Sequence, residues 1–523
     1  MNAVLALCQA GRWAEVEARV GPMLRAFPND VGLHNLLGSA HAEQGRHAAA
    51  AESFRKAAAL APKSPELQFN LGVACGQAGR WDDAVAAYRR ATALKPGFEV
   101  AHYNLGTALK QLGRLDEAAA SLRAAIALQP GYVAAHGNLG AVLQVQGRLD
   151  DAVASYRQAL AIAPNAKGHL SLASALRMQG RLDEAALQLH EALALEPGYA
   201  DAHNNLGETL WDLGRADAAL AAYRAALTID PAHGEANYNL GTLLYDGGRL
   251  DEAIAYFERS GLRDWQERRL YCLYKSRRFD DFRAALQPML AQRPTSPFLA
   301  TLSAHHAANF GEPDPYGFCR RPLDFVHHAR IDALAEPGSA LVQDLLRDVT
   351  GAEIAERKQG RLHHGIQSAG NLFKRPEASF RTLAGLIERA LDDYRARFAG
   401  ADCEYMRAFP ARSVFSSSWY VKMRRGGHLT SHIHETGWLS GVVYLAMPPR
   451  APGSTEGCIE FSTHGDDYPK QRDDFPMATV APQVGDIVLF PSSLFHRTIP
   501  FEAEQDRVCV AFDLQPDPAL HAG

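Results

Sequence analysis

The stretch AHYNLGTALKQLGRLDEAAASLRAAIALQPGY, residues 101–132, contains a pattern that recurs along the first half of the chain. Small and apolar side chains return at helical spacing on either side of a Gly-Arg pair, at Leu105, Leu109, Leu112, Leu115, Ala118, Leu122 and Ala125. A face that recurs every three or four residues is typical of an amphipathic helix. The stretch therefore predicts two such helices, separated by a turn at Gly113 and ended by Pro130 and Gly131.

The pattern has a fixed period. The tripeptide NLG begins at residues 70, 104, 138, 205 and 239, and a proline closes the units at positions 28, 62, 96, 130, 164, 197 and 231. The step between prolines is 34 residues, with one step of 33. This period and pattern resemble the tetratricopeptide repeat, in which stacked helix pairs form a superhelix with a long concave groove. The resemblance predicts an all-α array over residues 1–293, with about eight repeats and a degenerate cap.

One asparagine recurs at the same place in the first helix of a repeat. By the 3.6-residue turn it lies about 100° around the helix from the leucine stripe, so it can face the groove. The repeats resemble most those of the protein O-GlcNAc transferases, whose groove asparagines hold the backbone of an extended peptide. The matching residues are Asn70, Asn104, Asn138, Asn205 and Asn239. The resemblance implies a protein or peptide substrate in the groove; the alternative is an asparagine that merely suits this position of the helix.

The composition limits the class of partner. The 523 residues carry a net charge of −5, which argues against a nucleic-acid platform and against binding to an anionic membrane. The sequence contains neither a run of roughly 18 apolar residues nor a recognisable signal peptide, so we expect no membrane segment. The seven cysteines are scattered and odd in number, which is typical of free thiols in a reducing compartment. We expect a cytoplasmic protein, and the sequence leaves its oligomeric state open.

The pattern changes after the repeats. Residues 294–324 are rich in proline and glycine and lack the repeat spacing, which predicts a connector. Residues 376–398 then predict one amphipathic helix that begins at a proline. From residue 414 onward, short apolar runs such as VFSSSWYVKM, WLSGVVYLAM and RVCVAFDLQ are separated by Gly, Pro and Asp. These runs predict an all-β module, either a sandwich or a barrel.

Two histidines precede one of these runs in SHIHETGWLSGVVYL, residues 431–445. Side chains two apart in a strand point the same way, so His432 and His434 share a face and can share a metal. His496 follows a later apolar run, and Arg507 begins the next one eleven residues on. This order resembles the prolyl-hydroxylase-like Fe(II)/2-oxoglutarate oxygenases of the double-stranded β-helix (jelly-roll) fold. It is most similar to the bacterial proteins that join tetratricopeptide repeats to a 2OG-Fe(II) oxygenase domain.

The resemblance implies a multidomain chain that is α and then β. The all-α superhelix would be followed by an oxygenase domain over residues 325–516, with flanking helices and a β-helix core at about 410–516. The implied cofactors are Fe(II), with 2-oxoglutarate and O₂ as cosubstrates.

The implied metal ligands are His432, His434 and His496. They depart from the family, which usually has Asp or Glu at the position of His434. A third imidazole leaves the site one negative charge short, and a three-histidine set suits zinc or copper as well as Fe(II). A site with two histidines and water, in which His434 lies behind the ligands, stays open.

The implied cosubstrate contacts are Arg507, Tyr444 and Ser440. A guanidinium can bind the far carboxylate of 2-oxoglutarate with two hydrogen bonds, and the two hydroxyl groups can donate to the cosubstrate. The alternative for Tyr444 is an aromatic side chain packed in the core. No catalytic residue beyond the metal and cosubstrate sites is expected.

These observations predict an Fe(II)/2-oxoglutarate-dependent dioxygenase that hydroxylates a protein or peptide side chain held in the repeat groove. Two other classes stay open. One is an inactive scaffold that binds protein partners through its repeats, and the other is a cupin-like metalloenzyme with another substrate. Formation of succinate from 2-oxoglutarate separates the first class from both others.

Overall fold

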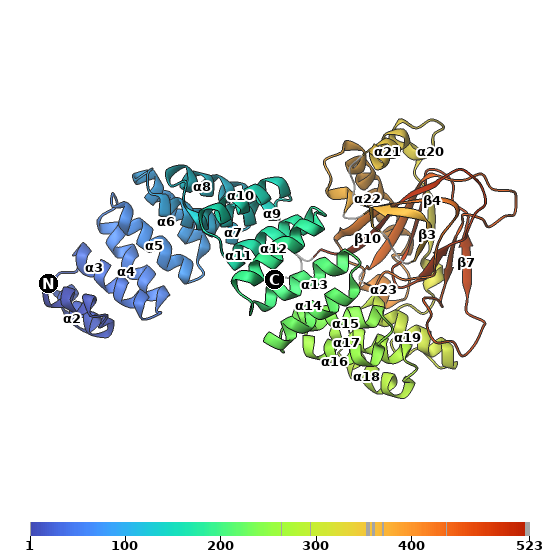
Figure 1. Cartoon of the computed structure of the whole chain (residues 1–523), viewed down its shortest axis with the longest axis horizontal. Coiled ribbons are helices and arrows are strands. Elements are labelled where there is room, and N and C mark those ends of the chain that lie inside the picture. Colours follow the sequence, from blue (N-terminus) through green and yellow to red (C-terminus); the bar gives the residue numbers. More distant parts are fainter. Residues whose placement is uncertain are drawn as a thin grey trace. The chain divides into compact units, whose positions relative to one another are not determined.

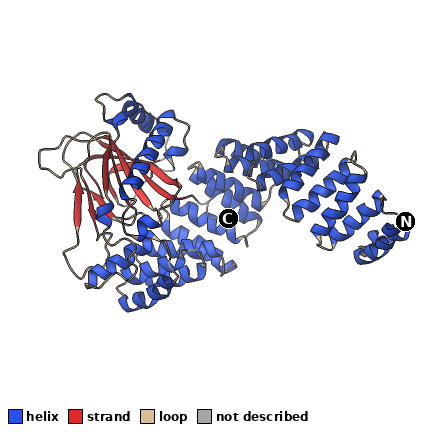
Figure 2. Ribbon diagram, turned by 180° about the vertical axis from the view of Figure 1, so that it is seen from behind, coloured by secondary structure: helices blue, strands red, loops and turns tan. Residues whose placement is uncertain are grey.

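The structure is a computed structural model, and it describes residues 2–262, 264–292, 294–351, 356–357, 361–368, 371–435 and 437–517. The ends 1 and 293 of the predicted array lie outside these ranges. The chain forms two compact units, Met1–Asn239 and Leu240–Gly523. Helices make up the first unit, and all the described strands belong to the second (Figure 1, Figure 2). The prediction of an α-helical part followed by a β domain is confirmed.

The first unit is a stack of antiparallel helix pairs. Its helices are α1 (Asn2–Gln9), α2 (Trp13–Ala26), α3 (Val31–Glu43), α4 (His47–Leu60), α5 (Pro65–Gln77), α6 (Trp81–Leu94), α7 (Glu99–Gln111), α8 (Leu115–Leu128), α9 (Val133–Val145), α10 (Leu149–Ile162), α11 (Ala166–Met178), α12 (Leu182–Leu195), α13 (Ala200–Asp212) and α14 (Ala216–Ile229). The boundary between the units falls within α15 (Gly234–Asp246).

The glycine of the recurring NLG tripeptide has a packing role. A Cβ atom at Gly72 would lie 2.6 Å from the ring of Tyr88, and one at Gly140 would lie 2.7 Å from the ring of Tyr156. Real Cβ atoms do not come this close, so the first helix of a repeat can lie against the aromatic side chain of the second only where it has glycine. The tripeptide is therefore a signature of close helix packing within each repeat.

The second unit begins with helices and ends in a β domain. Its helices after α15 are α16 (Leu250–Ser260), α17 (Trp265–Lys275), α18 (Phe279–Ala291), α19 (Pro297–Phe310), α20 (Asp332–Ala335), α21 (Ala340–Gly351), α22 (Ala378–Phe398) and α23 (Glu404–Arg407), with 3₁₀ turns η1 (Pro322–Phe325) and η2 (Leu372–Lys374). The predicted helix at 376–398 corresponds to α22.

The segment expected to be a connector, 294–324, contains the buried helix α19. The helix begins with Pro297 in its first turn, and the hydroxyl of Ser296 accepts a hydrogen bond from the backbone nitrogen of Leu299 at 3.2 Å. A proline at this position suits a helix start, because its missing N–H has no partner there anyway. Pro297 therefore begins a helix, so the prolines of this segment do not all mark breaks in regular structure.

Two antiparallel sheets form the β domain. The strands are β1 (His327–Arg330), β2 (Glu356–Arg357), β3 (Leu362–Ser368), β4 (Ser413–Leu429), β5 (Leu439–Ala446), β6 (Ile459–Ser462), β7 (Met477–Val480), β8 (Asp486–Pro491), β9 (Phe495–Thr498) and β10 (Arg507–Pro516). The order is β1-β8-β5-β10-β4-β3-β2 in the large sheet and β7-β6-β9 in the small sheet. Neither sheet closes into a barrel within the described residues. A shared apolar core, which includes Val421, Tyr444, Phe461 and Phe490, joins the two sheets.

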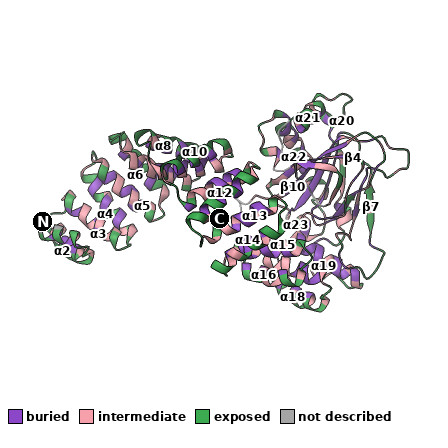
Figure 3. Cartoon of the chain, in the orientation of Figure 1, coloured by how far each residue is buried: buried purple, intermediate pink, exposed green. Residues whose placement is uncertain are grey.

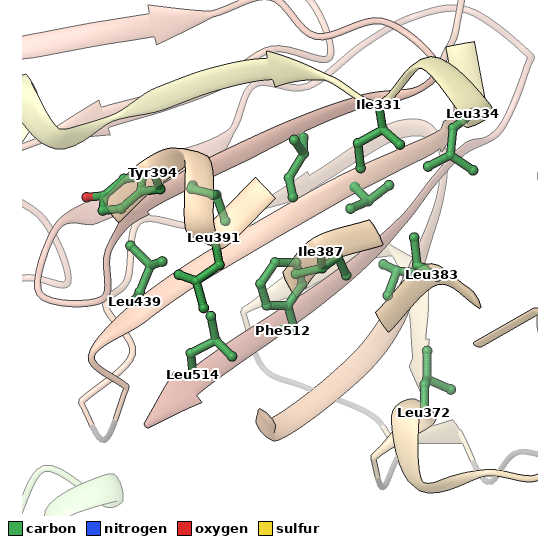
Figure 4. Close-up of a cluster of buried hydrophobic side chains, with 14 of the residues drawn as sticks. Ile331, Leu334, Leu372, Leu383, Ile387, Leu391, Tyr394, Leu439, Phe512 and Leu514 are labelled. Carbon is green, nitrogen blue, oxygen red and sulfur yellow. The ribbon is translucent and has the colours of Figure 1, made fainter. Parts of the chain in front are cut away.

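The two faces of β10 serve different purposes. Phe512 and Leu514 point to one side, where Figure 4 shows them beside Ile387 and Leu391 of α22. Because side chains alternate along a strand, the residues between them face the core shared by the two sheets. These inward-facing residues are Arg507, Cys509, Ala511 and Asp513. Strand β10 is buried over most of its length, whereas β7 at the edge of the small sheet is largely exposed (Figure 3).

Helices α17, α18 and α19 share a core with the β domain. Leu270, Phe282 and Leu299 of these helices cluster with Ile433 and with two aromatic residues of the β domain, Tyr468 and Phe495. The last helices of the repeat region are thus built into the same compact unit as the sheets.

Candidate functional site

The histidine segment lies between β4 and β5 and runs beside β9. The backbones of His432 and His496 exchange two hydrogen bonds, of 3.1 and 3.0 Å, and the backbone nitrogen of His434 donates to the carbonyl oxygen of Ser492 at 3.0 Å. The expected strand through this segment is reduced to this bridge. The same-face prediction nevertheless agrees with the geometry. The ring centroid of His432 lies 5.3 Å from that of His434 and 4.3 Å from that of His496.

The hydrogen bonds of the three rings define which nitrogen is available. Nδ1 of His432 and Nδ1 of His496 each contact the backbone carbonyl oxygen two residues earlier, at 2.8 and 3.1 Å. Nδ1 of His434 contacts the carboxylate of Asp513 at 2.5 Å. A carbonyl or carboxylate oxygen can only accept, so all three rings carry a proton on Nδ1, and in the neutral form of each ring the lone pair lies on Nε2.

The three available nitrogens converge. The candidate ligand atoms of the three histidines all lie within 4.8 Å of one another, and Nε2 of His432 is 3.4 Å from Nε2 of His434. Two lone pairs at this distance repel unless a cation lies between them. Nitrogens that are each about 2.1 Å from one metal are separated by roughly 3.0–3.4 Å, so this spacing fits a divalent transition metal.

Burial keeps the rings of His432 and His496 neutral. Burial, together with the neighbouring histidines, lowers the pKa of His432 to about 3 and holds the pKa of His496 well below its usual value. Metal binding requires deprotonated imidazole, so these rings need not lose a proton at neutral pH. The donor set therefore fits a metal ion.

A buried carboxylate lies behind His434. Burial raises the pKa of Asp513, but His434 and the hydroxyls of Ser440 and Ser417 outweigh this effect and leave the pKa below its usual value. The hydroxyls donate to the two carboxylate oxygens at 2.7 and 2.9 Å. Sequence reasoning missed Asp513, although its place on the inward face of β10, six residues after Arg507, was a usable signal.

The residues between and after the two histidines point away from the metal position. Ile433 packs in the core with α17 and α19, and Glu435 forms an ion pair with Arg268 of α17. The alternation of side chains and this ion pair exclude Glu435 as a carboxylate ligand of the metal position.

Arg507 is fully buried between the sheets. Its Nε donates to the carbonyl oxygen of Gly457 at 3.3 Å, and its remaining polar contacts in the described part of the chain are the sulfur atoms of Met423 and Cys509. The guanidinium lies 5.1 Å from the ring centroid of Tyr444. No carboxylate among the described residues forms an ion pair with it. A buried cation without a counter-charge is costly, so this position suits an anionic ligand.

Tyr444 and Ser440, both predicted to contact the cosubstrate, lie at different ends of β5. The hydroxyl of Tyr444 is buried and has no hydrogen-bond partner in the described residues, and burial raises its pKa so that it stays a donor. The hydroxyl of Ser440 instead contacts Asp513, Ser492 at 2.8 Å and His434 at 3.1 Å. Ser440 therefore belongs to the polar network behind His434.

Three of the five recurring asparagines bridge neighbouring repeats. They donate from Nδ2 to side chains 35 or 31 residues earlier, in the preceding repeat. These contacts are Asn70 to Asn35 at 3.3 Å, Asn138 to Tyr103 and Thr107 at 3.2 Å each, and Asn239 to Asn204 and Glu208 at 3.1 and 2.9 Å. This pattern gives these three asparagines a packing role.

Other features leave a binding role open. Asn205 donates to the carbonyl oxygen of Asp201 in its own helix, and Asn104 makes no side-chain hydrogen bond within the described residues. All five asparagines are half-buried, and Asn70 lines a cavity of about 460 Å³. Their side-chain oxygens can accept further hydrogen bonds.

Sequence comparisons agree with the geometry of both units. A family described as "Putative 2OG-Fe(II) oxygenase" matches residues 417–513, a range that contains the three histidines, Arg507 and Asp513. Tetratricopeptide-repeat families match residues 31–96, 77–122, 103–167, 170–233 and 210–271. The chain joins tetratricopeptide repeats to a domain of this oxygenase family. The resemblance predicted from the motifs is confirmed.

Several solved structures also match the chain. A crystal structure of MamA is 27% identical, covers 30% of this chain and 92% of its own, and has a TM-score of 0.28. YrrB, described as a TPR protein with an unusual peptide-binding site, is 22% identical, covers 37% of this chain and 100% of its own, and has a TM-score of 0.31. Pseudomonas aeruginosa pilF is 22% identical, with coverages of 39% and 95% and a TM-score of 0.34. No curated protein matches the chain.

No helix in the described part of the chain is both long enough and apolar enough to cross a membrane.

Proposed function

We propose that the oxygenase domain is an Fe(II)- and 2-oxoglutarate-dependent dioxygenase that hydroxylates a side chain of a protein or peptide. The observation that carries the proposal is the convergence of three imidazoles, each with Nδ1 on an acceptor, in the same core as a buried arginine that lacks a counter-charge among the described residues. The family match to residues 417–513 supports the same class of chemistry.

His432, His434 and His496 would hold the metal through Nε2. Three protein ligands on one side of a metal leave positions for a cosubstrate and for O₂. When bound, Fe(II) supplies the oxidative decarboxylation of 2-oxoglutarate to succinate and CO₂, with one oxygen atom of O₂ entering succinate and the other a C–H bond of the substrate. The chain's contribution is to fix the three nitrogens through the acceptors on Nδ1, so that the site needs little rearrangement on metal binding.

Arg507 and Tyr444 would bind the far carboxylate of 2-oxoglutarate. The guanidinium offers charged donors, and the Tyr444 hydroxyl offers one more that has no described partner. Cys509 and Ala511 lie between Arg507 and Asp513 on the inward face of β10, and both are small. Small side chains are what a ligand lying along this face requires.

One assay separates this proposal from the two other classes. The purified chain is loaded with Fe(II) under anaerobic conditions, supplied with 2-oxoglutarate and O₂, and assayed for succinate. We expect succinate from the wild type and none from an Arg507→Ala variant at low 2-oxoglutarate. A chain that holds metal but forms no succinate would instead be a scaffold or a metalloenzyme with another substrate.

We also propose that the repeat array binds the substrate through its asparagines. An amide side chain can contact a peptide backbone whatever the side chains of the peptide are, so such contacts give affinity without sequence preference. Replacement of Asn104, Asn138 and Asn205 by alanine should then weaken the binding of a full-length protein substrate by about 0.5–1.5 kcal/mol for each lost contact. Turnover of a short peptide that reaches only the metal site should be unchanged.

Asn104 and Asn138 form a matched pair for this test. Asn138 bridges two repeats, so its replacement by alanine should also lower the melting temperature, whereas Asn104 has no described hydrogen bond to lose. Weaker substrate binding by Asn104→Ala with an unchanged melting temperature supports the binding role. If only Asn138→Ala has an effect, and on stability alone, the asparagines are packing residues.

A further inference from the structure

Asp513 is a buried carboxylate that contacts one ring of the candidate metal site. Its residue is 7% exposed, and its ion-pair partner within the described residues is His434, a ring that would be neutral while its Nε2 lone pair held a metal. Its other partners are the hydroxyls of Ser440 and Ser417. A buried carboxylate without a nearby cation is costly, and hydroxyl groups offset only part of that cost.

The candidate metal position lies on the far side of His434. Asp513 contacts Nδ1 of this ring, and Nε2 of the same ring faces Nε2 of His432 at 3.4 Å. A divalent metal held by three neutral imidazoles has no anionic ligand from the protein. In a metal-bound site, the carboxylate and the metal would thus be the two uncompensated charges, and one imidazole would join them.

We propose that Asp513 is a positioning residue for the metal, an inference that rests on the proposed metal site. It accepts the Nδ1 proton of His434, which directs Nε2 of that ring toward the other two histidines. It also supplies, through the ring, the negative charge that an Asp or Glu at the position of His434 would otherwise provide. A carboxylate behind a ligating histidine makes the ring a stronger donor.

The carboxylate itself is held in place. Ser440 donates to one of its oxygens and Ser417 to the other, and Ser440 contacts Ser492, whose carbonyl oxygen accepts from the backbone of His434. The orientation of His434 is therefore determined from both its side chain and its backbone. Strands β4, β5 and β10 and the residue after β8 all contribute to it.

Two substitutions separate orientation from charge. Asp513→Asn keeps an oxygen that can accept from Nδ1 of His434 but removes the charge, and Asp513→Ala removes both. Partners of this kind typically change metal affinity by about 10- to 100-fold. We expect the Kd for Co(II), titrated anaerobically into the full chain, to rise about tenfold in Asp513→Asn and toward a hundredfold in Asp513→Ala.

A second buried aspartate provides the control. Asp486 on β8 is 5% exposed and contacts Nε2 of His328 on β1 at 2.7 Å, away from the three histidines. Asp486→Asn should leave Co(II) binding unchanged, whatever it does to the melting temperature. Equal losses of affinity in Asp486→Asn and Asp513→Asn would make the effect a general result of removing a buried charge and would overturn the inference.

The remaining outcomes are also decisive. Wild-type Co(II) affinity in Asp513→Ala, in protein that circular dichroism shows to be folded, would overturn the positioning role. Wild-type Co(II) affinity in Asp513→Asn would overturn the claim that the negative charge of Asp513 strengthens metal binding. Because Co(II) binding needs no turnover, a wild-type chain that forms no succinate but shows the expected order of affinities would refute the proposed function and leave this inference intact.

Discussion

Replacing Arg507 by methionine separates what this residue does for the fold from what it does for the cosubstrate. Arg507 is buried beside Tyr444, and its described polar contacts are one carbonyl oxygen and two sulfur atoms. Methionine has a similar length and no charge. Removal of a buried charge that has no counter-charge is often neutral or stabilising. We therefore expect the variant without 2-oxoglutarate to be at least as stable as the wild type, within about 1 kcal/mol.

The cosubstrate should behave differently. Hydrogen bonds to charged groups contribute about 1.5–3 kcal/mol, and each 1.4 kcal/mol is about a tenfold change in affinity, so the Kd for 2-oxoglutarate should rise about 10- to 150-fold. At a concentration 100 times the wild-type Kd, 2-oxoglutarate stabilises the wild type by about 2.7 kcal/mol. A variant with a hundredfold higher Kd gains only about 0.4 kcal/mol under the same conditions.

The assay is denaturant unfolding of the metal-loaded chain under anaerobic conditions, with and without 2-oxoglutarate. Lys422→Met is the matched control. Lys422 lies on β4 between the inward-facing residues Val421 and Met423, so its side chain points away from the core shared by the two sheets, and it pairs with Asp506 at 3.0 Å. Its gain from 2-oxoglutarate should equal that of the wild type. An undiminished gain in Arg507→Met, or a loss confined to Lys422→Met, would refute the reasoning.

Three further predictions concern stability. Burial and the neighbouring His464 lower the pKa of His305 to about 3, so between about pH 6.5 and pH 3 the unfolded chain binds a proton that the folded chain does not. The free energy of unfolding should therefore fall by about 2 kcal/mol from pH 7 to pH 5. The fall should be smaller in His305→Gln. Arg268→Ala should cost about 1–3 kcal/mol in thermal unfolding because it leaves Glu435 unpaired, and the exchanged pair Arg268→Glu with Glu435→Arg should recover part of that loss. A chain that begins near residue 231 should fold, whereas one that begins at 325 should aggregate because it lacks the helices that cover Ile433; equal solubility of the two would contradict this.

The period and the alternation of side chains accounted for much of the architecture. The 34-residue period reflects contacts between residues that are close in the sequence, such as Gly72 and Tyr88. It predicted the helix pairs because each repeat has the same short-range packing. The spacing of His432 and His434 predicted a common face for the same reason. Even where the regular strand failed to form, the extended backbone kept the alternation.

Contacts between distant segments could not be predicted in this way. The acceptor of His434 lies 79 residues away on β10, and no local pattern specifies which strand ends beside the histidines. Helix α19 was not predicted, because the segment around it is rich in proline and glycine. Ser296 and Pro297 are nevertheless a recognisable helix start. The contacts that Asn70, Asn138 and Asn239 make 35 residues earlier follow from the stacking of neighbouring repeats, which the pattern within one repeat does not reveal.

The central claim is that His432, His434 and His496 hold one metal ion through Nε2, and anaerobic metal analysis tests it most directly. The wild type, purified without oxygen and supplied with Fe(II), should contain about one iron per chain. His432→Ala and His496→Ala should each lose it while remaining folded, and His434→Ala should lose it too if the three nitrogens converge as described. Near-normal iron content in His496→Ala, or a wild type that retains zinc alone, would contradict the account.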